Sequence, residues 1–210
     1  MKKLSLKEQA YQQIKQLIID GNFKPGESLT ERELTESLSM SRTPIRSALE
    51  KLEADGFIQN FPNKGPVVSN ISFHKLVNIY DLRIAIESHS AKQYSHFVLT
   101  EEMKMSFIEN LAAQKNAMDE QDSIKFSYFD REFHYLILKF YGNEEIIKVF
   151  DQIQNQLLLL ALEVFKSKQG NLELFFNEHQ IIYNLILEGN GEEAANIITK
   201  HLEYGKQTLL

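Results

Sequence analysis

The stretch "SMSRTPIRSALEKLEADGF", residues 39–57, places two arginines, a proline and several hydroxyl side chains ahead of a regular helical pattern. Proline favours the first helical position and disfavours helix at the residue before it, so Thr43 is the predicted N-cap, with Ser41 as the competing cap. Apolar residues then recur at the spacing of one helix face: Ile45, Ala48, Leu49 and Leu52. The stretch therefore predicts a helix whose solvent side begins with hydrogen-bonding groups.

The flanking residues predict two more helices and a hairpin. An apolar face from about Leu6 to Asp20 predicts a first helix, and Thr30 with Glu33 forms a capping box for a second helix through Leu38. After the third helix, "FIQNF" and "PVVS" are joined through "PNKG" and predict a small hairpin. Three helices with a short turn between the second and third, followed by a hairpin, describe a winged helix-turn-helix.

In such a unit the third helix enters the DNA major groove with its N-terminal residues at base edges. Arg42 and Arg46 would then reach guanine edges or phosphates, and Ser41 and Thr43 would bond phosphate oxygens. Lys64, near the hairpin tip, would meet the DNA backbone. The alternative is that these residues only cap and solvate a surface helix.

Charge is distributed unevenly along the chain. Residues 1–72 carry 10 Lys/Arg against 9 Asp/Glu, whereas residues 73–210 carry 13 against 20, and the whole chain has a net charge of -6. Total charge therefore does not argue for nucleic acid, and any case for DNA binding depends on where the arginines lie.

The prolines mark a boundary between two kinds of sequence. All four prolines lie in the first 66 residues, and the remaining 144 residues have apolar periodicity near that of a helix. Helices are expected at about 73–97, 101–120, 123–141, 144–167, 172–188 and 191–208. The predicted fold is mostly α, with a winged helix-turn-helix over 1–71 followed by an all-α antiparallel helical bundle over 72–210.

Composition bounds the class of protein. The chain of 210 residues is 43% hydrophobic and 25% charged, as expected of a globular protein, and it has no cysteine, which excludes disulfides and thiolate metal sites. No stretch resembles a signal peptide or approaches the length of a membrane span. We expect a cytoplasmic protein with no membrane partner.

Histidines stand out within the helical part. His179 and His201 lie in the middle of apolar stripes, while Asp130 and His134 are four residues apart and so share a helix face. One carboxylate with three imidazoles suits a divalent metal such as zinc, nickel or manganese. The spacing is equally compatible with a buried hydrogen-bonded cluster.

A metal-dependent enzyme on a helical bundle is the alternative function. A mononuclear site with open positions can hydrolyse or oxidise a substrate. The sequence has neither two E-x-x-H helices nor H-E-x-x-H, and it also lacks a P-loop, G-x-S-x-G and G-x-G-x-x-G. Enzymatic activity would also not explain the helix-turn-helix pattern of residues 30–65. We therefore expect a protein that is not an enzyme.

Residues 11–57 resemble the DNA-binding domain of the GntR family of bacterial transcription regulators. The matching pieces are "G-x-x-x-P-G-x-x-L", "L-T-E-R-E-L", "S-R-T-P-I-R-x-A-L" and "L-x-x-x-G-F", followed by "N-K-G" at the wing. The resemblance implies DNA contact at five positions: Arg32, Arg42, Thr43, Arg46 and Gly65. Ser39 stands where the family often has glycine, which questions the backbone geometry of the turn.

The helical part resembles the FadR-type effector domain, through "D-R-E-F-H", "N-E-H" and "K-H-L". The resemblance implies that four residues hold a divalent metal beside a small carboxylic acid: Asp130, His134, His179 and His201. The segment "YDLRIAIESHSA" resembles that domain's first helix, which makes Arg83 a candidate for the effector carboxylate. An ordinary Arg83 to Glu87 pair within the helix is the alternative.

Together these features predict a metabolite-responsive transcription regulator, expected to be a repressor. A homodimer is expected, because a symmetric pair of recognition helices reads a palindromic double-stranded DNA operator. Whether effector binding releases or tightens the DNA complex stays open.

Overall fold

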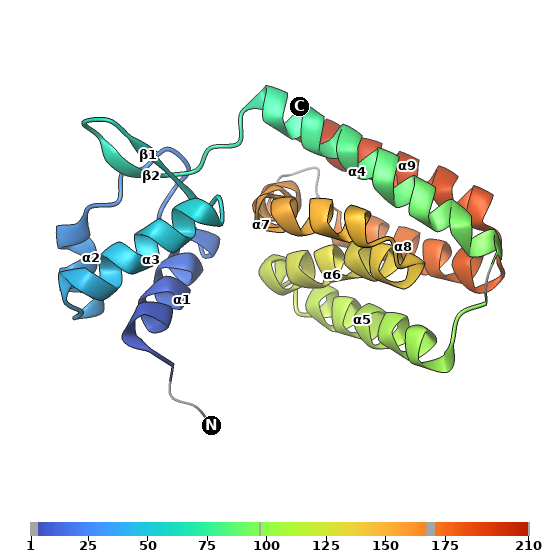
Figure 1. Cartoon of the computed structure of the whole chain (residues 1–210). Coiled ribbons are helices and arrows are strands. Elements are labelled where there is room, and N and C mark those ends of the chain that lie inside the picture. The colour runs from blue at the N-terminus through green and yellow to red at the C-terminus, as the bar shows by residue number, and fades with distance from the viewer. Residues whose placement is uncertain (1–3, 97, 167–170, 210) are drawn as a thin grey trace. The chain divides into compact units, whose positions relative to one another are not determined.

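The computed structural model describes residues 4–96, 98–166 and 171–209. The chain divides into two compact units, Met1–Ile71 and Ser72–Leu210. The first unit contains α1 (Leu6–Ile19), α2 (Glu31–Leu38), α3 (Arg42–Ala54), β1 (Ile58–Phe61) and β2 (Gly65–Val68), all labelled in Figure 1. The two strands pair antiparallel, with Ile58 opposite Val68.

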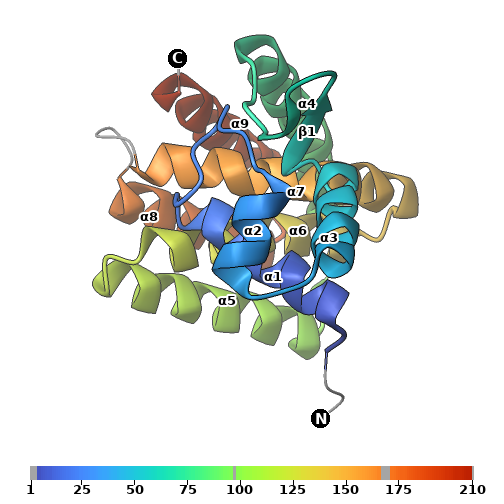
Figure 2. The same cartoon turned by 90° about the vertical axis from the view of Figure 1, so that its left-hand side faces the viewer.

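The core of the first unit lies between α1, α2, α3 and the base of the hairpin. All four residues of the predicted apolar face of α3 are buried: Ile45, Ala48, Leu49 and Leu52. α3 packs against α1, whose Ile14 and Ile18 are also buried, and against α2, beside which it lies in Figure 2. Each fully buried Leu or Ile contributes about 1.5–3 kcal/mol, so the face fixes α3 and leaves its other side to solvent.

The turn between α2 and α3 contains a left-handed residue that is not glycine. Ser39, the C-cap of α2, has φ +52°, and the backbone N–H of Met40 donates to the Thr35 carbonyl. A serine at this position is compatible with the turn, although a left-handed residue with a Cβ carries a conformational cost. At the other end of α2, Thr30 accepts from the Glu33 backbone N–H, as the capping box predicted.

Of the two predicted N-caps of α3, Ser41 is confirmed and Thr43 was wrong. The helix begins at Arg42 with Ser41 in extended conformation as its N-cap, and Thr43 is already in the first turn. The missing N–H of Pro44 costs nothing at this position, because the first four amides of a helix have no partner within it. Pro44 is therefore the third residue of the helix, although proline prefers the first position, and α3 begins two residues earlier than that preference predicted.

The second unit is helical. It contains α4 (Phe73–Gln93), the 3-10 turn η1 (Tyr94–His96), α5 (Glu101–Asp119), α6 (Ser123–Tyr141), α7 (Glu144–Lys166), α8 (Leu172–Leu187) and α9 (Gly191–Thr208). The mostly α fold with a winged helix-turn-helix ahead of a helical bundle is confirmed, and helix ends agree within a few residues. Residues 97 and 167, the predicted ends of two helices, lie outside the described residues.

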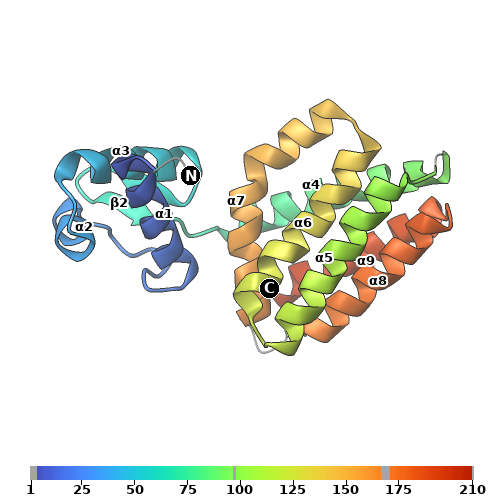
Figure 3. The ribbon, with the colours of Figure 1, turned by 90° about the horizontal axis from the view of Figure 1, so that it is seen from below.

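Five of these helices form a closed ring. α4 packs against α9, α9 against α8, α8 against α5, α5 against α6, and α6 against α4, while α7 packs on α6 and α4. Figure 3 shows α5, α6, α8 and α9 side by side, with α7 at their edge. The interior of this ring is where buried side chains from all five helices meet. No helix among the described residues is long and apolar enough to cross a membrane.

Candidate metal centre and DNA-binding surface

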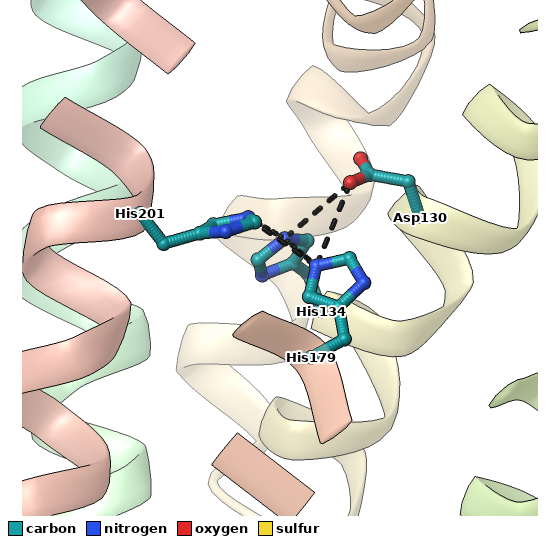
Figure 4. Close-up of side chains that lie close together, drawn as sticks. All are labelled: Asp130, His134, His179 and His201. Carbon is teal, nitrogen blue, oxygen red and sulfur yellow. Dashed lines mark hydrogen bonds and ion pairs between the residues drawn. The ribbon is translucent and has the colours of Figure 1, made fainter. Parts of the chain in front are cut away.

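The four predicted ligands meet inside the ring. Asp130 and His134 come from α6, His179 from α8 and His201 from α9, and all four are buried (Figure 4). One potential ligand atom from each residue lies within 4.8 Å of the others. The i,i+4 spacing predicted only that the two α6 residues share a face; the packing of α8 and α9 brings the other two to them.

The three imidazoles converge through the same ring atom. The Nε2 of His134 lies 3.2 Å from that of His201 and 3.3 Å from that of His179, and the last two are 3.2 Å apart. The Oδ1 of Asp130 lies 3.6 Å from His179 Nε2 and 3.9 Å from His134 Nε2. The four atoms therefore surround one small space.

Each imidazole has an oxygen acceptor at its other nitrogen. Nδ1 lies 2.7 Å from Gln114 Oε1 in His179 and 2.7 Å from Glu178 Oε2 in His201. In His134, Nδ1 lies 2.6 Å from Glu87 Oε2, an ion-pair contact without the alignment of a regular hydrogen bond. An acceptor at Nδ1 places the proton of a neutral ring there and leaves a lone pair on Nε2.

The orientation of the Gln114 amide is itself fixed. Its Nε2 donates to Asn110 Oδ1 at 2.6 Å, and Asn110 Nδ2 donates to the Phe129 carbonyl at 3.0 Å. The Gln114 oxygen is therefore the atom directed at His179. Sequence reasoning did not identify Gln114 or Glu178. Two polar residues at buried positions of α5, Asn110 and Gln114, are the signal that was available.

Burial disfavours the charged form of His179 and of His134. It lowers the pKa of His179 well below its ordinary value, and His201, His134 and Arg83 act in the same direction. Burial also lowers the pKa of His134, although Glu87 opposes this. For Glu87, burial favours the neutral acid, but Arg83 and His134 outweigh it and lower the pKa to about 2.

The residues fit a divalent cation. Three lone pairs about 3.2 Å apart repel one another unless a positive charge lies between them, and an ion about 2.1 Å from each nitrogen would see them at angles of about 100°, between tetrahedral and octahedral values. Three carboxylates and one guanidinium adjoin the site, a formal charge of minus two: Asp130, Glu87, Glu178 and Arg83. A dication would neutralise it.

A small cavity adjoins the ligand cluster. Its volume is about 10 Å³, room for about one water molecule. It is lined by Tyr80, Arg83, Asp130, Ala161, Val164, Phe165, Phe175, His201, Leu202 and Gly205. Tyr80 and Arg83 of α4 therefore line the same small cavity as Asp130 and His201.

Arg83 forms the predicted ion pair within α4 and also lines the cavity. It is buried, and its Nε donates to Glu87 Oε1 at 2.7 Å, so the intrahelical pair is present. The same side chain lines the cavity beside Asp130 and His201. The pair thus holds the guanidinium at the edge of the candidate metal centre.

The candidate DNA-binding residues all lie in the first unit and are mostly exposed. Arg42 and Thr43 are in the first turn of α3, directly after the Ser41 cap. Lys64 occupies the turn between the strands, and Gly65 begins β2 with φ +73°, a conformation that favours glycine. These residues lie at the protein surface in two places, the start of α3 and the hairpin tip.

The two remaining arginines are paired with carboxylates. Arg32 on α2 contacts Glu36 at 3.2 Å, with 84% of its side chain exposed. Arg46 donates to both oxygens of Glu31, from Nε at 2.9 Å and from Nη2 at 3.1 Å. The Arg46 guanidinium is therefore presented in a fixed orientation, which the sequence did not indicate.

Comparison with known proteins gives matches over most of the chain. The model of "Bacterial regulatory proteins, gntR family" matches residues 6–68, and that of the "FCD domain" matches residues 78–204. The second match alone covers more than half of the chain.

Similar full-length proteins are transcription regulators by name. The HTH-type transcriptional regulator YdhC of Bacillus subtilis is 26% identical over 199 residues, covering 93% of this chain and 87% of that protein. The HTH-type transcriptional repressor RspR of Escherichia coli is 26% identical over 198 residues, covering 93% and 85%. The crystal structure of a putative transcriptional regulator GntR from Rhodococcus sp. RHA1 matches with TM-score 0.82 and 20% identity over 98% of both chains, which shows a shared fold.

Proposed function

The chain belongs to the gntR family of bacterial regulatory proteins and carries an FCD domain, and on this premise we propose that it is a metabolite-responsive repressor. As a family member it is a transcription regulator with a DNA-binding helix-turn-helix. The finer proposal is that the helical unit binds a divalent metal and a small carboxylic acid, and that this binding controls attachment to the operator. The observation that carries it is the convergence of three histidine Nε2 atoms, each with an oxygen at its Nδ1.

The proposed cofactor is zinc, nickel or manganese. Asp130, His134, His179 and His201 would supply one carboxylate and three imidazoles, a donor set that suits these ions. A bound ion would act as a Lewis acid with open positions for oxygen ligands. The proposal assigns it a binding role and no catalytic one, in keeping with relatives that are named regulators.

The proposed effector is a small carboxylic acid. Arg83 lines the cavity next to Asp130 and His201, and a guanidinium is well suited to a carboxylate oxygen. One carboxylate oxygen would face the metal centre and the other would face Arg83. Charge favours this arrangement, because the dication first neutralises the surrounding carboxylates.

The proposed DNA target is a palindromic operator read by a homodimer in the cytoplasm. One recognition helix reads too few base pairs to be selective, whereas two related by symmetry read two half-sites. Arg42 and Arg46 would reach guanine edges or phosphates, and Ser41 and Thr43 would bond phosphate oxygens. Lys64 would meet the DNA backbone, and Arg32 and Gly65 would also touch DNA. The name of the E. coli relative, a transcriptional repressor, supports repression here. The effector would shift the placements available to the two DNA-binding units, only some of which fit both half-sites.

Three measurements on gently purified full-length protein test the proposal. Elemental analysis should find about one divalent ion per chain, and light scattering should find a dimer at micromolar concentration. Selection from random duplexes should recover a palindromic sequence. The affinity of the metal-loaded protein for that sequence should change when a carboxylic acid is added. If the protein contains no metal and chelator leaves its melting temperature unchanged, the four residues form a buried hydrogen-bonded cluster and not a metal site. The DNA-binding assignment would stand without them.

A further inference from the structure

One surface of the helical unit carries several large apolar side chains that are open to solvent. α5 exposes Met105 and Ile108, at 50% and 46%, and α8 exposes Ile181 and Leu187, at 47% and 45%. The two helices pack against each other and lie side by side in Figure 3. Their outer surface is called the α5/α8 face below. Exposed apolar residues that gather on one surface are typical of an interaction site.

The α5/α8 face is poor in charge along α8. The helical unit as a whole is acidic, with 13 Lys/Arg against 20 Asp/Glu over residues 73–210. Two copies of this unit therefore repel each other on average, and they approach most easily through a surface that lacks acidic side chains. Between Glu173 and Glu188 the exposed residues of α8 are all uncharged: Asn177, Gln180, Ile181, Asn184 and Leu187.

The same face contains a groove between its two helices. The groove has a volume of about 530 Å³ and is lined by side chains of α5 and α8. Its apolar lining comes from Leu111, Met118 and Phe176, and the exposed Lys115 and Glu173 add one charge of each sign. Leu111 and Phe176 are buried, so they form the floor. The groove can therefore receive an apolar side chain from outside.

The projecting residues and the groove lie at opposite ends of the face. The ring centres of Phe107 and Tyr183 are 5.4 Å apart, and Gln114 accepts a hydrogen bond from His179. α8 therefore runs antiparallel to α5, and Leu187 lies toward the start of α5. The exposed apolar residues of α5 are in its first half as well, whereas the groove lies along its second half.

A face with projections at one end and a hollow at the other is complementary to itself. A two-fold axis in the plane of contact, crossing both helices near their middle, reverses the direction of each helix in a second copy. Met105 and Ile108 of each copy then meet the groove of the other, as in an isologous interface. Ala112 lies close to this axis, and its small side chain allows the two α5 helices to approach closely.

We propose that the α5/α8 face is the interface of the homodimer, with the apolar residues at the start of each α5 inserted into the groove of the other copy. This inference rests on the homodimer of the proposed function and adds its surface and its symmetry. The two helices of the interface are also those joined by Gln114 and His179, so the interface and the candidate metal centre share them.

Ala112→Arg tests the position of the axis. Ala112 is exposed, so an arginine there leaves the fold of one copy undisturbed, but symmetry brings two guanidinium groups together in the contact. The dissociation constant of the full-length dimer should rise at least about 100-fold, because like charges that meet across an interface strongly oppose association. Analytical ultracentrifugation over a concentration series measures it. Val149→Arg, at an exposed apolar residue of α7, is the matched control and should leave the dimer unchanged.

A single cysteine tests the same contact directly, since the chain has no cysteine of its own. In Ala112→Cys the two thiols of a dimer lie close together, so a short bismaleimide should link most of the protein into covalent dimers. Val149→Cys should give little covalent dimer at the same concentration. Ile108→Ala removes one projection from each copy and should raise the dissociation constant about tenfold, as for a central interface residue.

The possible failures are distinguishable. A parent that is monomeric at micromolar concentration, with and without operator, overturns the proposed homodimer and this inference with it. A dimeric parent overturns this inference alone if Ala112→Arg dimerises equally well or if Ala112→Cys is not linked, since the copies would then meet through another surface. Equal weakening by Val149→Arg and Ala112→Arg would also contradict it. Melting temperatures verify that each variant is folded, and the cysteine experiment decides if Ala112→Arg is not.

Discussion

Gln114 accepts a hydrogen bond from His179 across the interface of α5 and α8, with 2.7 Å between Oε1 and Nδ1. α5 supplies no ligand, yet this contact fixes which nitrogen of His179 is available for a metal. Gln114→Leu removes the acceptor and leaves the ring free to place its proton on Nε2. We expect metal affinity to fall about 10- to 100-fold, as for other partners of metal-binding histidines. Competition with a chromophoric chelator measures it.

Gln114→Glu is the matched control, because it keeps an oxygen at the same position. It should bind metal at least as well as the parent, since the added negative charge also attracts the ion. Equal affinity in the leucine variant and the parent would show that the His179 tautomer does not depend on Gln114.

Metal removal should destabilise the helical unit. Ligands come from α6, α8 and α9, so an ion ties together helices that no covalent bond joins. At a free metal concentration about 100 times the dissociation constant, binding adds about 2.7 kcal/mol to the free energy of unfolding. The melting temperature should fall after chelation and recover on adding back zinc, nickel or manganese.

His179→Ala tests whether the helical unit can lose metal and effector binding while the DNA-binding unit keeps its function. It removes one ligand inside the ring and should abolish both the metal-dependent melting shift and the response to effector, while operator binding survives. An effector response that persists in this variant would place the sensing site elsewhere. His74→Gln, at an exposed residue outside the cluster, should behave like the parent in both assays.

Much of this arrangement follows from the sequence, and the reason for the rest is physical. Apolar periodicity gave the helices, because a helix face must be buried as a whole, and it placed His179 and His201 on such faces. It could not give Gln114 or Glu178, whose roles depend on contacts between residues far apart in sequence. Of the two predicted caps of α3, the sequence favoured Thr43 over Ser41 because proline prefers the first helical position, but Pro44 is also compatible with the third position, where its missing N–H has no partner within the helix.

Acid should destabilise the metal-free protein in two steps. The folded pKa values of His179 and His134 lie below the ordinary value of 6.5, so on acidification the unfolded chain takes up protons that the folded chain does not. Stability is therefore retained above about pH 6.5 and lost below it, by about 1.4 kcal/mol per pH unit for each ring. Glu87, with a folded pKa of about 2 against 4.5, adds a further loss below pH 4.5.

Urea unfolding in chelator at pH 7.5, 6.5 and 5.5 measures the first step. His179→Gln should reduce the pH dependence, whereas His74→Gln should leave it unchanged. A parent whose unfolding free energy is constant from pH 7.5 to 5.5 would mean that the two rings take up protons as readily in the folded chain as in the unfolded chain.

An arginine in the second turn of the recognition helix should carry sequence preference. Arg46 extends from α3 with its guanidinium held by both oxygens of Glu31, which orients a planar group that can bond a guanine edge at two points. Arg46→Ala should weaken binding to the selected operator by about 1–3 kcal/mol and relax base preference at one position of each half-site. Lys64→Ala, at the hairpin tip, is the comparison: it should lower the affinity for specific and random duplexes alike and reduce the salt dependence of binding.

Glu31→Gln keeps the size and shape of the side chain but weakens its bond to Arg46. It should therefore reduce discrimination between operator and single-base variants more than it reduces affinity for random DNA. Fluorescence anisotropy with operator, point-variant and random duplexes at several salt concentrations resolves the three patterns. If Arg46→Ala and Lys64→Ala lose affinity equally on every duplex, Arg46 contacts phosphate, and base reading must come from other residues at the start of α3.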